Sequence, residues 1–132
     1  MGLAGKYQVV KNQGVLEHMT AQGIPAEQAV KFIEGSNNIE ITINGDNITI
    51  ARGDGHNRNY TNNKETTETA PDGNVIKNFS VLNGTTLTVE SSHSQGKWKR
   101  IYTLSDSGSE LTVVSKSGNA GIADGIRIYK KL

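Results

Sequence analysis

Apolar and polar residues alternate along most of the chain after residue 37, which is the pattern of half-buried β-strands. The clearest case is Ile39, Ile41 and Ile43, which are separated by polar residues and followed by the turn sequence at 44–47 and the apolar positions of 48–50. This segment predicts a hairpin with one buried face. Similar short segments, separated by turns rich in Gly, Asn, Asp or Pro, bring the expected number of strands to about ten.

Before residue 37 the period of the pattern changes. A first strand is predicted over 6–10, and Val15 and Met19 then fall at helical spacing. A second helix is expected to open at Pro25, because proline suits the first turn of a helix. Together the two helices span about 14–35 and lack a basic recognition face, so they predict a lid on the sheet rather than a DNA-binding motif. The apolar stripe of the second helix is Ala26, Ala29, Val30 and Ile33.

These elements predict one mainly β domain over residues 1–132, a ten-stranded antiparallel up-and-down barrel capped by a short helix-turn-helix. So many strands hide their edges best by curling into a barrel. A barrel of about ten strands is wider than side chains alone fill, and aromatic residues make up only 5% of the chain. We therefore expect an interior that encloses a small molecule.

The composition excludes several classes of function. The formal net charge is +1, with acidic and basic residues intermixed, which does not favour nucleic-acid binding. The chain contains no cysteine, so disulfides and thiolate metal sites are absent. The opening residues lack the apolar core of a signal peptide, and no apolar run reaches membrane length. We expect a cytoplasmic protein.

The sequence contains no motif that indicates catalysis. His18, His56 and His93 do not have the spacing of metal ligands. Neither a nucleophile elbow nor a phosphate-binding loop is present. We therefore expect no cofactor, no metal and no enzymatic activity.

The last predicted strand, 125–131, contains the most specific candidate chemistry. Arg127 and Tyr129 stand two positions apart and share one face. If that face points into the barrel, the guanidinium requires an anion, and a ligand carboxylate is the natural one. Alternation alone favours the opposite orientation, with Ile126 and Ile128 buried.

The order of one strand, two helices and nine further strands resembles that of the intracellular lipid-binding proteins, which include the fatty-acid-binding and cellular retinoid-binding proteins. The resemblance covers nearly the whole chain and implies a calycin-type barrel. The segments that carry it are Leu3-Ala4-Gly5-Lys6-Tyr7, the hairpin at 41–50, the hairpin at 72–87 and Ile126-Arg127-Ile128-Tyr129-Lys130.

The resemblance implies that Arg127 and Tyr129 point inward and bind the carboxylate of a fatty or retinoic acid. In the family a second arginine on the eighth strand assists them. Here the alignment places Thr103 at that position, with Ile101 on the same inner face and Arg100 on the outer face. The anchor is therefore expected to be weaker than in typical members.

The resemblance also implies lid and portal positions. Val15 and Met19 match ligand-contacting positions on the first helix, although packing of the lid on the barrel explains them equally well. Phe32, His56 and Pro71 fall at the portal. Strands within 57–69 are expected to be short, exposed and mobile, because that segment is poor in apolar residues.

Three functions follow as hypotheses. The first is a monomeric, non-catalytic carrier for long-chain fatty acids or similar amphipathic lipids, with transient membrane contact during ligand transfer. The second is the same container for bile salts, retinoids or a pigment-like ligand. The third is an enzyme that acts on a hydrophobic substrate. A secreted lipocalin fits less well, because that class has eight strands and lacks the early helix pair.

Overall fold

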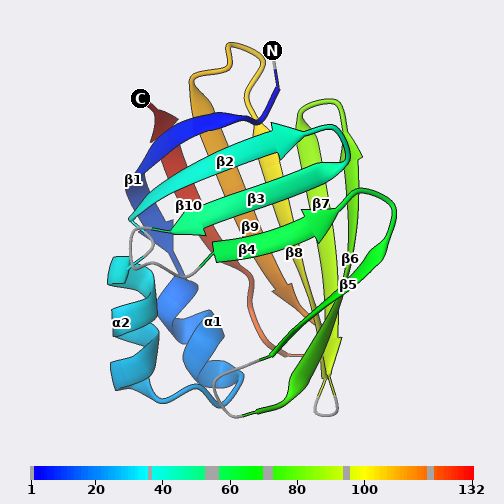
Figure 1. The fold of residues 1–132 in the computed structure, drawn as a ribbon. Helices are drawn as coiled ribbons and strands as arrows, with labels where there is room; N and C mark the ends of the chain where they lie inside the picture. Colours follow the sequence, from blue (N-terminus) through cyan, green and yellow to red (C-terminus); the bar gives the residue numbers. More distant parts are fainter. Residues whose placement is uncertain (1, 36, 53–56, 70–72, 94–95, 119–120) are drawn as a thin grey trace.

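The computed structural model describes residues 2–35, 37–52, 57–69, 73–93, 96–118 and 121–132. Within these residues the chain forms one ten-stranded sheet and two helices (Figure 1). The elements are β1 (Gly5–Gln13), α1 (Val15–Ala21), α2 (Ala26–Gly35), β2 (Asn38–Asn44), β3 (Asn47–Arg52), β4 (Asn57–Thr61), β5 (Glu65–Thr69), β6 (Val75–Asn83), β7 (Thr86–His93), β8 (Gly96–Leu104), β9 (Glu110–Ser117) and β10 (Gly125–Lys131).

The sheet is an antiparallel meander, and its order is β4-β3-β2-β1-β10-β9-β8-β7-β6-β5. The first and last strands lie side by side at its centre, where Val9 of β1 is opposite Tyr129 of β10. The predicted up-and-down arrangement, the ten strands and the helical cap are all confirmed. The first strand is longer than expected, because it continues through Gln13 across a bulge between Val9 and Lys11.

The two ends of the sheet approach each other and nearly close the barrel. The Ser80 hydroxyl of β6 donates to the Thr61 carbonyl at the end of β4 (2.9 Å). After the turn, the Asn63 amide donates to the Ser80 carbonyl (2.8 Å), and the Asn62 side chain accepts from the Leu82 amide (2.8 Å). These bonds use backbone groups that an open sheet edge would leave unpaired.

Alternation sorts the strand residues into an inner and an outer face. The inner face carries a hydrophobic core, and partly buried Val9, Ile43 and Leu82 pack against it. Burial of these side chains supplies the main stabilisation of the fold. The core consists of Leu3, Tyr7, Ile39, Ile41, Ile48, Ile50, Tyr60, Leu87, Val89, Tyr102, Leu104, Leu111, Val113 and Tyr129.

Residues 57–69 form two regular strands, β4 and β5, and part of this segment is buried. Tyr60 is only 3% exposed and lies opposite buried Ile48. The expectation of exposed strands was therefore wrong at this position. The cause is that aromatic Tyr60 fills the inner face where the surrounding sequence offers only polar residues.

The two helices lie together at one end of the barrel, away from both chain termini (Figure 1). In α1, buried His18 bonds through its Nδ1 atom to the Ala123 carbonyl before β10 (2.7 Å). Helix α2 begins after Pro25, whose carbonyl accepts from the Ala29 amide (2.9 Å). Ala29 is fully buried, but Ala26 is exposed and Val30 is 40% exposed, so the predicted apolar stripe was wrong at Ala26 and Val30.

No helix among the described residues is long and apolar enough to cross a membrane.

Candidate functional site

The inner face of β10 presents Arg127 and Tyr129, which are only 7% and 3% exposed. Their partners on β9 are Val113 and Leu111, both buried. Ile128 is only partly buried, so alternation alone gave the wrong orientation for this strand. Isoleucine suits the outer face here because its β-branched side chain packs well on a pleated surface.

The Arg127 guanidinium connects the barrel to the lid. Its Nε donates to the Asn12 side chain of β1 (2.7 Å), and its Nη2 donates to the Ile33 carbonyl of α2 (3.1 Å) and to the Asn37 side chain (3.1 Å). The acceptors of these three bonds are uncharged. Burial lowers the pKa of Arg127, and the neighbouring Tyr129 opposes that effect.

The Tyr129 ring lies 5.3 Å from the Arg127 guanidinium carbon. Burial raises the pKa of Tyr129 above its ordinary value, although Arg127 and, more weakly, Arg100 act to lower it. At neutral pH the phenol therefore keeps its proton and remains a hydrogen-bond donor.

On β8 the structure corrects the predicted face of each residue. Thr103 is exposed and Ile101 lies on the outer face, whereas Tyr102 and Leu104 are buried on the inner face. Arg100 shares that inner face and lies opposite buried Val89 of β7. Thr103 and Ile101 therefore do not line the interior.

The turn between β8 and β9 explains this correction. Leu104 is paired with Leu111, and the Ser105 amide donates to the Glu110 carbonyl (2.8 Å). Within the turn, the Gly108 amide donates to the Ser105 carbonyl (2.9 Å). Because Leu111 faces the interior, its partner Leu104 does as well, and Tyr102 and Arg100 follow on the same face by alternation.

Arg100 lies near two phenols inside the barrel. Its side chain is hydrogen-bonded to that of Tyr102, and Tyr60 of β4 is also close. Burial alone would lower the pKa of Arg100, but Tyr102 and Tyr60, with a smaller effect of Glu68, raise it. Arg100 is therefore a permanent interior cation.

A chain of polar side chains continues from this region across β5, β6 and β7. Glu68 accepts a hydrogen bond from the Asn78 amide (2.9 Å), and Asn78 accepts one from the Ser91 hydroxyl (2.5 Å). Asn78 and Ser91 are buried. The Thr66 hydroxyl, opposite Asn78, is buried without a hydrogen-bond partner among the described residues.

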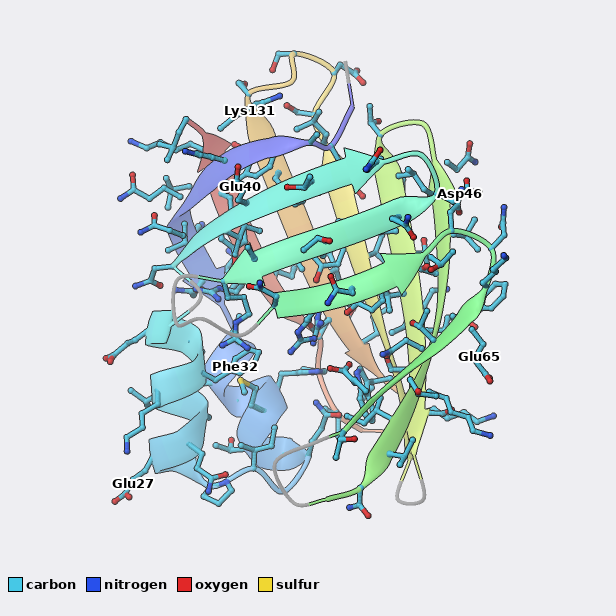
Figure 2. All side chains as sticks on the ribbon, in the orientation of Figure 1. Glu27, Phe32, Glu40, Asp46, Glu65 and Lys131 are labelled. Atoms are coloured by element: carbon cyan, nitrogen blue, oxygen red, sulfur yellow. The ribbon has the colours of Figure 1, made fainter. Side chains whose placement is uncertain are left out.

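At the predicted portal, Phe32 of α2 contacts two arginines. The guanidinium carbons of Arg52 and Arg58 lie 3.8 and 5.5 Å from its ring centre. Arg52 also donates to the Phe32 carbonyl (3.3 Å). Figure 2 shows Phe32 at the junction of α2 and the barrel, whereas Glu27 projects away from the other end of this helix.

Of the remaining predicted positions, two lie among the described residues. Val15 and Met19 are half-buried on α1. His56 and Pro71 lie outside the described residues. Among those that are described, no group of three or more His, Asp or Glu side chains is placed to hold a metal.

Two surface hollows lie outside the barrel interior. The larger, about 440 Å³, is bordered by exposed side chains such as Phe79, Glu90 and Lys116 on the outer face of β5 to β9. The smaller, about 240 Å³, lies beside β2 and β3 near Glu40 and Leu132. Neither hollow is lined by Arg127 or Tyr129. We therefore describe the interior site by the side chains that face inward.

Sequence reasoning missed Arg100, Tyr102 and Tyr60 as interior residues. One signal was available on β8, where Trp98, Tyr102 and Leu104 alternate with more polar positions. That face contains the larger apolar groups and is the better candidate for burial.

No protein-family model and no curated protein sequence matches the chain. Among solved structures, it is similar to the REP1-NXSQ fatty acid transporter, with a TM-score of 0.79 and 22% identity over 98% of this chain and 96% of that one. A Tyr-to-Phe mutant of that transporter gives 0.79 and 21%, covering 98% of each chain. A fatty-acid-binding protein from brain tissue of Drosophila melanogaster gives 0.80 and 23%, covering 97% and 98%. These similarities show that the chain has the fold of these proteins.

Proposed function

We propose that this chain is an intracellular lipid-binding protein, a non-catalytic carrier that encloses a long-chain fatty acid or a similar amphipathic lipid. Arg127 and Tyr129 bind its acid group. The observation that carries this proposal is the burial of both side chains on the inner face of a nearly closed barrel. The structures that share the fold are named as a fatty acid transporter and a fatty-acid-binding protein, which supports the same cargo class.

The interior supplies two contributions to the binding free energy of such a lipid, apolar burial and charge-assisted hydrogen bonds. Its apolar wall includes Ile41, Ile48, Leu87 and Leu111, all at most 1% exposed. Each enclosed methylene contributes on the order of 0.8 kcal/mol before the cost of ordering the ligand. A carboxylate beside Arg127 adds charge-assisted hydrogen bonds, which are stronger in a poorly solvated interior than in water.

The lid residues complete the proposal. Val15 and Met19 of α1 face the ligand from the lid, and Phe32 lies at the portal, where the helices and the barrel part to admit it. The carrier acts as a monomer in the cytoplasm without a cofactor or nucleic acid, and touches membranes only during ligand transfer.

A second cargo class is favoured by the polar side of the interior. Tyr60, Asn78, Ser91 and Arg100 offer hydrogen bonds that a saturated chain cannot use. A bile salt, a retinoid or a pigment-like molecule with several polar groups would satisfy them better.

Displacement of a fluorescent fatty acid by oleate, a bile salt and retinoic acid tests the proposal, and native mass spectrometry gives the stoichiometry. We expect oleate to compete at micromolar concentration. The carrier proposal fails if none of these lipids competes.

Substitution of Arg127→Leu tests the anchor. We expect oleate to bind about 10–100-fold more weakly, because the variant removes hydrogen bonds to a charged group. Oleyl alcohol should change by less than about twofold, since it lacks the carboxylate. Equal losses for the acid and the alcohol would show that Arg127 only holds the lid and barrel together.

A further inference from the structure

We propose that the outer face of β6 to β9 binds a second copy of this chain and forms a reversible two-fold dimer. The inference goes beyond the proposed carrier function and uses neither Arg127 nor Tyr129. In Figure 1, β6 and β7 lie on the side of the barrel away from α2, so a second copy can cover them without covering that helix. The monomer remains the carrier, and the dimer is an additional state that forms at high concentration.

The first argument is an exposed apolar stripe on the outer face of β6. Val75, Phe79 and Val81 are 56%, 42% and 37% exposed. They are three of the seven large hydrophobic side chains that are exposed among the described residues. A hollow of about 440 Å³ adjoins this strand, and Phe79 forms part of its border. The stripe is therefore the apolar surface that a partner would cover.

Strand pairing arranges the outer side chains of β6 to β9 in two parallel rows. The charged row consists of Phe79, Glu90, Lys99 and Lys116. The apolar row lies two positions away on every strand, or about 7 Å. It consists of Val81, Thr88, Ile101 and Val114. In the charged row the carboxylate stands on the half formed by β6 and β7, and both ammonium groups stand on the half formed by β8 and β9.

This order of charge makes the face complementary to itself. A two-fold axis that runs parallel to the strands, between β7 and β8, sets each row against the same row of the second copy in reversed strand order. Glu90 then faces Lys99 of the second copy, and Phe79 faces Lys116 of the second copy. Symmetry doubles both contacts, which gives two ion pairs and two cation–π contacts.

The apolar row matches itself about the same axis. Val81 faces Val114 of the second copy, and Thr88 faces Ile101. All four side chains are β-branched and pack well on a pleated surface. Twisted sheets that pack face to face keep their strands within about 30° of each other, so the rows stay in register near the axis.

The ion pairs within one copy leave this face available. Lys99 lies 3.8 Å from Glu90, and Lys116 lies 3.2 Å from Asp124. Each of these four side chains is at least 42% exposed, so the pairs lie in water and contribute little to stability. In the dimer, Glu90 and Lys99 of both copies form one network of two acids and two bases, which is the arrangement in which surface charges do contribute.

The position of the acids decides against a membrane as the occupant. The lysines on this face would favour an anionic lipid surface. However, Glu65 of β5 and Glu90 of β7 stand directly beside Phe79. Insertion of the Phe79 ring among anionic headgroups would bring both carboxylates against charges of the same sign. A second copy instead presents Lys99 and Lys116 to the half of the face that carries Phe79 and Glu90.

The size of the contact makes the dimer reversible. The curvature of the barrel limits the contact to about four strands, which at about 4.8 Å per strand span roughly 19 Å. The strands pair over seven or eight residues, or roughly 25 Å of length. Each copy therefore buries on the order of 500 Å², and the total of about 1,000 Å² lies at the lower limit for a specific interface.

Sedimentation equilibrium of the full chain between about 10 µM and 1 mM measures the association. We expect the average mass to rise from that of one copy towards that of two. Phe79→Ser should weaken the dimer about tenfold, because the ring lies at the centre of the contact. Val10→Ser is the matched control, since Val10 is 56% exposed on β1, outside this face. It should change the dissociation constant by less than about twofold.

Charge reversal tests the facing of Glu90 and Lys99. Glu90→Lys and Lys99→Glu should each stop the association, because like charges then face each other across the axis. Mixed in equal amounts, the two variants should associate with each other, since every facing pair again has opposite charges. Far-ultraviolet circular dichroism shows whether each variant is folded.

The inference is overturned if the chain sediments as a single copy up to about 1 mM. It is also overturned if either charge variant dimerises as the original chain does, or if the mixture of the two does not associate. A chain that stays monomeric but binds vesicles of phosphatidylcholine and phosphatidylserine, with Lys99→Glu weakening that binding, would show that this face docks on a membrane instead. None of these outcomes affects the carrier function, which lipid displacement tests separately.

Discussion

At the scale of single residues, Gly125 shows how a close contact between two elements limits which residue a position can hold. Gly125 opens β10 where α1 crosses it, and its backbone conformation is an ordinary one. A Cβ atom at this position would lie 3.2 Å from the Cβ of His18 and 3.2 Å from the Cα of Val15. This glycine therefore sets the distance between the lid and the barrel.

We expect Gly125→Ala to destabilise the protein by about 1 kcal/mol, because α1 must move away by a few tenths of an ångström. Chemical denaturation measures the free energy of unfolding. Gly2→Ala is the control, since nothing lies within 4 Å of the added atom. Similar stabilities for the two variants would show that the lid has slack at this point.

At the scale of the elements, α2 is attached to the barrel through its C-terminal carbonyls. Arg52 of β3 donates to the Phe32 carbonyl and Arg127 of β10 donates to the Ile33 carbonyl. The last carbonyls of a helix have no partner within the helix and carry partial negative charge, so cations stabilise this end. Two strands that are not neighbours thereby fix one end of the lid.

Substitution of Phe32→Ala should loosen α2 without unfolding the barrel. It removes the stacking contacts with Arg52 and Arg58, each worth on the order of 0.5–2 kcal/mol. We expect the amides of α2 to exchange with deuterium about tenfold faster, as a loss of about 1.4 kcal/mol implies.

Val30→Ala provides the matched control for that measurement, because Val30 lies on the same helix and is 40% exposed. Its effect on exchange should stay below about twofold. Equal acceleration in the two variants would mean that shortening any side chain of α2 loosens this helix, and that the arginine contacts do not control the opening of the lid.

At the scale of the whole molecule, alternation and turn chemistry predicted the strands, their meander and the lid, because these depend on neighbours in sequence. The prediction failed where the partner residue on the next strand decides which face a residue occupies. Arg100 and Thr103 exchanged faces because the pairing of Leu104 with Leu111 fixes the register of β8. Tyr60 is buried through its position opposite Ile48, in a segment whose local composition indicated exposure.

The buried tyrosines make the stability of the whole fold sensitive to alkaline pH. Tyr7, Tyr60 and Tyr129 are at most 3% exposed, and burial raises the pKa of each above the ordinary value of 10.0. Above about pH 10 the unfolded chain therefore releases phenolic protons that the folded chain retains. The unfolded state then binds fewer protons than the folded state, so the free energy of unfolding must fall as the pH rises.

We expect the free energy of unfolding to be insensitive to these groups below about pH 9 and to fall above pH 10. The limiting slope is about 1.4 kcal/mol per pH unit for each tyrosine, or about 4 kcal/mol for all three. Urea denaturation between pH 8 and 11 measures it. Tyr7→Phe, which also removes the 2.6 Å hydrogen bond to the Leu3 carbonyl, should lower the stability at all pH values but reduce the slope by about a third. An unchanged slope in this variant would show that Tyr7 ionises equally in both states, and that the alkaline loss comes from the other two phenols inside the barrel.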